Sequence, residues 1–136
     1  MGGQSCLAHP DAVRSIHRAY VEAGCDILIT NTLTMNRIFI ETHKVGVDVR
    51  EVNVAGARLA RQAAGSGCRV LGDISSTGQL LEPYGECTEE QVFAALKEQA
   101  GHLAGAGVDA FIVETMLDLR EALCAVRACH AAADLS

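Results

Sequence analysis

The sequence predicts an α/β fold in which three parallel strands alternate with helices. Three short apolar runs predict the strands, at residues 27–30, 70–73 and 110–113. They recur at intervals of roughly forty residues with helical periodicity between them, a pattern typical of stacked strand–helix units. The third run is continuously apolar rather than alternating, so we expect a strand that is covered on both faces.

The first helix is predicted to begin at Pro10 and to end at Gly24. Proline suits the first helical position because its missing N–H has no partner to lose there, and glycine readily adopts the left-handed conformation that closes many helices. Val13, Ile16 and Tyr20 recur at helical spacing, which predicts one apolar face that docks on the sheet.

Three segments have a weaker pattern. Residues 1–9 show no helical periodicity, and within residues 33–46 the run from Ile38 to Ile40 favours either a short helix or a packed loop. Residues 75–85 form a long polar segment after the second strand. This segment is either a substrate loop or a plain surface connection.

Each of the three later helices is predicted to begin at a capping box, in which the side chains of two residues three apart cap the first turn. The pairs are Asp48 with Glu51, Thr88 with Gln91, and Asp118 with Glu121. In the last helix, Leu119, Leu123 and Val126 are predicted to face the core. Asp26 and Asp109 lie before the first and third predicted strands, at the amino-end rim of the sheet, and are predicted to be turn and cap residues.

Composition and charge limit the classes of function. The chain has 136 residues, 49% of them apolar and 21% charged, so we expect residues 1–136 to form a single globular domain. Seventeen acidic against eleven basic residues, without a basic cluster, argue against a nucleic-acid partner. No apolar run approaches the roughly 20 residues that span a membrane, and residues 1–4 do not resemble a secretory signal. We therefore expect a cytoplasmic protein.

The cysteines and histidines do not predict a metal site. The six cysteines are scattered without a Cys-x-x-Cys pair, and they are expected to be small buried hydrophobic residues in a reducing compartment. The five histidines also lack the spacing of metal ligands. We assign neither a metal ligand nor a catalytic residue within this chain.

Polar side chains follow each predicted strand. Asn31 and Thr32 follow the first, Asp73 ends the second, and Glu114 and Thr115 follow the third. Because α/β folds bind ligands at the carboxyl ends of parallel strands, we expect these side chains to lie at one edge and to bind a substrate. A structural salt bridge at Glu114 and loop capping by Asn31 and Thr32 are the alternative interpretations.

Four segments occur in an order and spacing that resemble a known family. They are residues 9–20 (HPDAVRSIHRAY), 23–32 (AGCDILITNT), 72–78 (GDISSTG) and the pair Glu114-Thr115. Together they resemble the homocysteine S-methyltransferase family, which includes the homocysteine-binding module of cobalamin-dependent methionine synthase, betaine–homocysteine methyltransferase and the S-methylmethionine enzymes. The match follows nearly the whole chain, so it is far more specific than any one segment.

The resemblance implies a (β/α)8 TIM barrel that binds homocysteine at the carboxyl ends of its strands and holds zinc through three cysteines of later strands. By this mapping the chain is a partial barrel with about strands 2–4 and their helices. The family's first strand and its cysteine segments have no counterpart here, and Cys124 and Cys129 have the wrong neighbours. Because such a barrel needs roughly 200 residues, we expect a fragment, or a half-barrel whose open edges are covered by another copy or another chain.

The implied reaction is methyl transfer to the thiol of homocysteine, which forms methionine. In the family, zinc deprotonates the thiol, because the thiolate is the nucleophile. The sequence leaves the methyl donor open between methylcobalamin, a betaine and a sulfonium, and methylcobalamin would imply a corrinoid protein or domain as partner. We expect this chain to carry the amino-acid-binding half and to be inactive alone.

The resemblance places Glu114 at the family's substrate-binding glutamate, where a carboxylate accepts hydrogen bonds from the homocysteine ammonium. Asn31 and Thr32 are expected to donate to the substrate carboxylate or to order Glu114. Asp73 is expected to orient the same network, and Thr115 is a further contact candidate. Two other functions stay open. One is a non-catalytic half-barrel that serves as a binding or assembly module. The other is an unrelated barrel acting on a phosphorylated or carbonyl substrate, although no glycine-rich phosphate loop is present.

Overall fold

The computed structural model describes residues 2–133 as an alternation of helices and strands. In chain order the elements are α1 (Ser5–Ala8), α2 (Pro10–Glu22), β1 (Ile27–Ile29), α3 (Arg37–Thr42), α4 (Val49–Ala64), β2 (Arg69–Ile74), α5 (Glu89–Gly105), β3 (Ala110–Val113) and α6 (Leu119–Ala132). The three predicted strands are confirmed, and the run from Ile38 to Ile40 lies in a short helix. The single turn α1 forms where the sequence showed no helical periodicity. Within residues 2–133, no helix is both long enough and apolar enough to cross a membrane.

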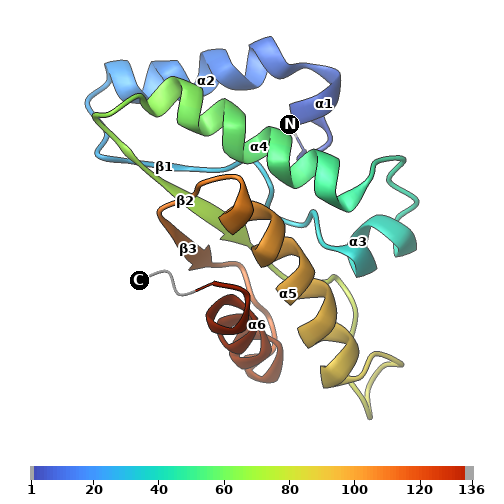
Figure 1. The fold of residues 1–136 in the computed structure, drawn as a ribbon. Coiled ribbons are helices and arrows are strands. Elements are labelled where there is room, and N and C mark those ends of the chain that lie inside the picture. The colour runs from blue at the N-terminus through green and yellow to red at the C-terminus, as the bar shows by residue number, and fades with distance from the viewer. Residues whose placement is uncertain (1, 134–136) are drawn as a thin grey trace.

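The strands form one parallel sheet in the order β1–β2–β3. Leu28 pairs with Val70, and Leu71 pairs with Ala110, so the three strands run in register from the amino to the carboxyl edge. Helices α2, α4, α5 and α6 each contact the next in this order and form a layer beside the sheet (Figure 1). The predicted α/β class is thereby confirmed.

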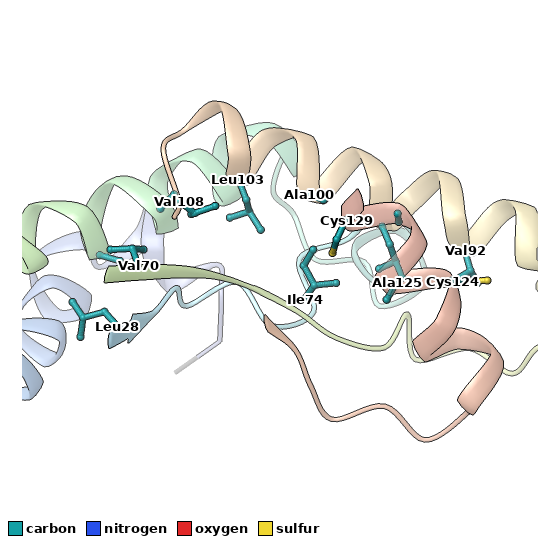
Figure 2. Packing of buried hydrophobic residues seen from close by; sticks show 14 of the residues in the cluster. Leu28, Val70, Ile74, Val92, Ala100, Leu103, Val108, Cys124, Ala125 and Cys129 are labelled. Atoms are coloured by element: carbon teal, nitrogen blue, oxygen red, sulfur yellow. The ribbon is translucent and has the colours of Figure 1, made fainter. Parts of the chain in front are cut away.

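The main core lies between the strands and this helix layer. Leu28, Val70 and Ile74 extend from the strands into the core and are at most 3% exposed. Figure 2 shows them with Val92 and Leu103 of α5 in the same cluster. Each such side chain contributes roughly 1.5–3 kcal/mol through burial, so this face of the sheet carries much of the stability.

The opposite face of the sheet is open. Ile27 and Ile29 of β1 point away from the core and are 49% and 40% exposed. Strand β3 is half-buried along its whole length, so the prediction that both its faces are covered is wrong. The reason is that the described helices cover only one face of the sheet, and β3 also has no neighbouring strand on one side among residues 2–133.

The predicted apolar face of α2 is wrong in two of its three positions. Val13 is buried, but Ile16 and Tyr20 are 47% and 61% exposed. The other buried residue of this helix is His17. Helical spacing identified an apolar stripe correctly, but only part of that stripe has a packing partner among the described residues.

The core-facing side of α6 also differs from the prediction. Leu119, Leu123 and Val126 are 74%, 54% and 43% exposed, so the expectation that they face inward is wrong. The helix instead buries small residues, including Ala125 and Ala128, against the core. Small side chains allow α5 and α6 to approach closely. This explains why the core contacts the side of α6 with the alanines rather than the side with the larger apolar residues.

All three predicted cap residues cap their helices, but only one of the three predicted capping boxes is complete. Thr88 and Gln91 form a complete capping box, and the side chain of Asp48 accepts the N–H of Glu51. Asp118 also caps its helix, but through the N–H of Arg120, and Glu121 bonds elsewhere. The predicted box between Asp118 and Glu121 is therefore wrong, and the predicted box between Asp48 and Glu51 forms only its Asp48 half.

Candidate functional site

Asp73 and Glu114 lie next to each other at the carboxyl edge of the sheet. Asp73 pairs with Ile112, and Glu114 follows two residues later, so the alternation of side chains places both carboxyl groups on the same face. Asp73 is 5% exposed, whereas Glu114 is half-buried. The register of the two strands, which local sequence does not specify, thus makes them neighbours.

The carboxyl group of Asp73 has a strongly perturbed acidity. Burial, which is the larger cause, and the neighbouring carboxyl of Glu114 together raise the pKa of Asp73 to about 7. Its Oδ1 atom is buried without a hydrogen-bond partner among the described residues. Like charges at close range disfavour double ionisation, so Asp73 and Glu114 behave as a coupled acid pair.

Thr115 supports Glu114 from the adjacent position. Its hydroxyl donates to Oε2 of Glu114 at 3.3 Å, and its carbonyl accepts from the hydroxyl of Ser75 at 3.3 Å. The backbone of Thr115 has a φ of 52°, which is unfavourable for a β-branched residue. Strain of this kind accumulates at functional sites, and here it occurs where β3 ends.

Thr32 is fully buried in a network beneath the site. Its hydroxyl donates to the carbonyl of Asp73 at 3.0 Å and lies 2.7 Å from the hydroxyl of Thr30, which accepts the N–H of Asp73. The side-chain amide of Gln99 donates to the carbonyl of Thr32 at 2.8 Å. Thr32 therefore ties β1 to β2 and holds the backbone of Asp73 in place.

Asn31 is bound to the amino-terminal segment. Its side-chain N–H group donates to the carbonyl of Gly2 at 3.1 Å and to the sulfur of Cys6 at 3.7 Å. Asn31 also lines a cavity of about 510 Å³ together with Glu114. Thr32, Asp73 and Thr115 do not line this cavity.

The same cavity has an apolar wall and one buried histidine. Its wall includes Ile16 and Tyr20 of α2 and Ile27 and Ile29 of β1. His17 also lines it, is 6% exposed, and has an Nε2 atom without a partner among the described residues. Burial lowers the pKa of His17, so the imidazole is neutral at neutral pH.

Glu121 is a second functional candidate that the sequence did not reveal. This carboxylate is 2% exposed and accepts three hydrogen bonds: from the N–H and the hydroxyl of Thr77, both at 2.7 Å, and from the hydroxyl of Ser76 at 2.8 Å. It anchors the start of the polar segment that follows β2. Its place in the first turn of α6 suggested a local cap, and only the fold brings Thr77 within reach.

The described residues do not fit a zinc site. All six cysteines are free and dispersed. No group of three or more His, Cys, Asp or Glu side chains in residues 2–133 is arranged to hold a metal ion. The three-cysteine set implied by the family resemblance is therefore not formed by this part of the protein.

The comparisons with known proteins agree with the arrangement of strands and helices. Methionine synthase of Mycobacterium tuberculosis is 33% identical over 123 residues, which cover 86% of this chain and 10% of that protein. Methionine synthase of Mycobacterium leprae is 32% identical over the same shares of both chains. The chain thus spans about a tenth of these relatives.

Solved structures show the same fold at lower identity. The metallated form of the homocysteine methyltransferase MmuM from Escherichia coli has a TM-score of 0.74 and 21% identity, covering 96% of this chain and 51% of that one. The oxidized form has a TM-score of 0.76 and 20% identity, covering 94% and 49%. The fold is accordingly a partial TIM barrel. The family model for homocysteine S-methyltransferases matches residues 2–135, and the chain belongs to this family.

Proposed function

We propose that this chain forms the amino-acid-binding part of an S-methyltransferase that transfers a methyl group to the thiol of homocysteine and forms methionine. The observation that carries the proposal is Glu114, a half-buried carboxylate at the carboxyl edge of the sheet that lines a cavity and has no ion-pair partner among the described residues. Such a group suits the ammonium of an amino acid. Family membership supports homocysteine as that amino acid.

The other site residues have supporting roles in this proposal. Thr115 orients Glu114 by its hydrogen bond, and Thr32 holds the backbone of Asp73. Asn31 shares the cavity with Glu114 and is proposed to face the amino-acid backbone of the substrate. Ile27 and Ile29 give the same space an apolar wall.

The metal and the methyl donor are proposed to come from outside these residues. The described residues do not form a zinc site, so a zinc ion, which would lower the pKa of the substrate thiol, would be held by residues outside them. A corrinoid protein or domain is the proposed donor partner, because the curated relatives are methionine synthases. The cytoplasm is the proposed compartment.

The proposal is tested by calorimetric titration with L-homocysteine, which measures its binding. The titration is done with and without zinc, on this chain and on a version extended to the length of the solved relatives. In the extended protein, Glu114→Gln is expected to raise the KM for homocysteine by at least tenfold, because a charge-assisted hydrogen bond is lost. Asp26→Asn, an exposed acid at the opposite rim, is the matched control and is expected to leave KM unchanged. An unchanged KM in Glu114→Gln removes Glu114 from the site.

A second candidate function is a non-catalytic assembly module. It is favoured by the exposed stripe Leu119, Leu123 and Val126 on α6, which is available for another chain. Size-exclusion chromatography separates the two candidates: a stable oligomer that does not bind homocysteine supports the module.

A further inference from the structure

The acid pair Asp73–Glu114 lacks a compensating positive charge. Seven ion pairs occur in the described part of the chain, and none includes either residue. Burial of an uncompensated carboxylate is costly, and the usual response is to bind a proton. Among the described residues the pair therefore favours binding of a cation, either a proton or one supplied by a ligand.

The neighbouring elements supply no such cation. From α2, His17 lines the cavity beside Glu114 and is neutral because its burial lowers its pKa. Near the end of β1, the thiol of Cys6 lies beside Asn31, and burial raises its pKa. From α6, Glu121 is occupied by the loop that follows β2. None of these three groups supplies a positive charge to the pair.

His17 is an independent sign of a ligand. It is more than nine-tenths buried, it lines the same cavity as Glu114, and its Nε2 atom has no partner among the described residues. Buried polar atoms are normally paired. The unpaired nitrogen belongs to a residue that lines the cavity, and the unpaired carboxylate oxygen belongs to Asp73, the neighbour of Glu114, which also lines it. Together they indicate that a polar group binds there.

We propose that Asp73 and Glu114 hold one proton between them in the free protein, and that the primary ammonium group of an amino acid replaces this proton on binding. The proton passes to the buffer, the ammonium keeps its three hydrogens, and the pair changes from one negative charge to two. The inference rests on the proposed function, because it assumes that the amino acid binds at Glu114. Asp73 is then a positioning residue that makes binding depend on pH.

The first test needs no ligand. The side-chain carboxyl carbons of Asp and Glu are labelled with carbon-13, and their NMR shifts are followed against pH. One carboxyl is expected to titrate near the value of about 7 derived for Asp73. Its signal should vanish in Asp73→Asn and should titrate at lower pH in Glu114→Gln. If every carboxyl titrates below about pH 5, near the unperturbed range, the proposal is overturned.

The second test uses L-methionine as the probe, since it has an ammonium group but no thiol to lose a proton. Calorimetry in two buffers of different ionisation enthalpy measures the protons released on binding to the extended protein. Near pH 6, below the pKa of about 7, the wild type should release most of one proton, and Asp73→Asn should release almost none. Asp26→Asn should behave as the wild type.

The outcomes separate the inference from the proposed function. Binding of L-methionine without proton release overturns the acid-pair inference and leaves the proposed function standing. Failure of both L-methionine and L-homocysteine to bind the extended protein overturns the proposed function, and the NMR titration still decides whether the pair holds a proton.

Discussion

Aspartates at the two edges of the sheet have opposite electrostatic environments. At the amino edge, Asp109 accepts the N–H of Val70 at 2.6 Å and the guanidinium of Arg61 at 2.7 Å, as expected of a cap residue. These contacts, first the Val70 N–H and then Arg61, lower the pKa of Asp109. At the carboxyl edge, Asp73 is buried beside another acid, and its pKa rises to about 7.

The contrast separates stability from function in this fold. A compensated carboxylate stabilises the folded chain when it is ionised, whereas an uncompensated one destabilises it. Natural proteins tolerate such destabilising groups mainly at functional sites. The amino edge therefore helps to hold the strands together through compensated charges, and the carboxyl edge is where we propose that the ligand binds.

The largest expected effect is a pH dependence of stability that Asp73 causes. Because the folded-state pKa lies above the value of 3.8 expected for the unfolded chain, the folded protein retains a proton that the unfolded one has lost. This contribution is fully present below about pH 4 and is lost as the pH rises to about 7, which amounts to at most about 4 kcal/mol. Urea unfolding across this range measures it, and Asp73→Asn should flatten the decline.

Asp109 should show the reverse sign in the same titration. Its lowered pKa means that its stabilisation is present above the unfolded value of 3.8 and is lost as the pH falls below it. If Asp73→Asn and Asp109→Asn altered the pH profile in the same direction, the contrast between the two edges would be refuted.

The next largest effect is expected at the carboxyl edge for Glu121→Ala. The substitution leaves the buried Thr77 N–H without its acceptor and removes two further hydrogen bonds, so it should cost roughly 3 kcal/mol. Denaturant unfolding measures the loss, and hydrogen exchange at the Thr77 amide should accelerate. Glu121→Gln keeps one acceptor oxygen and should cost less. Equal losses for both variants would show that the ionised carboxylate, rather than a single acceptor oxygen, is needed at this position.

A smaller loss is expected at the amino edge for Asp109→Ala. The N–H of buried Val70 and the guanidinium of Arg61 lose an acceptor, which should cost about 2 kcal/mol at neutral pH. The measurement is again denaturant unfolding. Because Asp109 belongs to the structural edge, amino-acid binding by the extended protein should not change, and a large change in affinity would contradict the division between the edges.

The smallest effect is expected for Asp26→Asn on the same amino edge. Asp26 is exposed, and surface substitutions of this type usually change the free energy of unfolding by less than about 0.5 kcal/mol. Thermal unfolding of the variant beside Asp109→Ala shows whether the amino edge depends on specific contacts or on negative charge alone. A loss as large as that of Asp109→Ala would favour charge alone.

Much of the fold was predictable because its signals are local. The strands at 27–30, 70–73 and 110–113 follow from apolar runs, and the Thr88 cap follows from residues three apart in sequence. The inward faces of α2 and α6 were not predictable, because an apolar stripe such as Leu119–Leu123–Val126 does not specify which neighbour covers it. Packing of α6 on α5 depends on small side chains of both helices, and helical periodicity does not encode that choice.

The candidate site shows the same division. That Asp73 and Glu114 end parallel strands follows from the chain order, and their placement at one edge needs only the general geometry of parallel sheets. Their role in binding remains a prediction. Neither the bond from Thr77 to Glu121, 44 residues apart, nor the unpaired nitrogen of His17 had any sequence signal.

The alternation of elements, the helix caps and the polar strand ends are properties of residues close together in the chain, and inspection of the sequence was enough to find most of them. Acidity, burial and the partners of Asp73, Glu114 and Glu121 arise from groups that are distant in sequence, and they depend on strand register and helix packing. Local conformational preferences determine the elements, caps and strand ends. The acidity, burial and partners of the three carboxylates depend instead on desolvation and on the charges that the folded chain places around them.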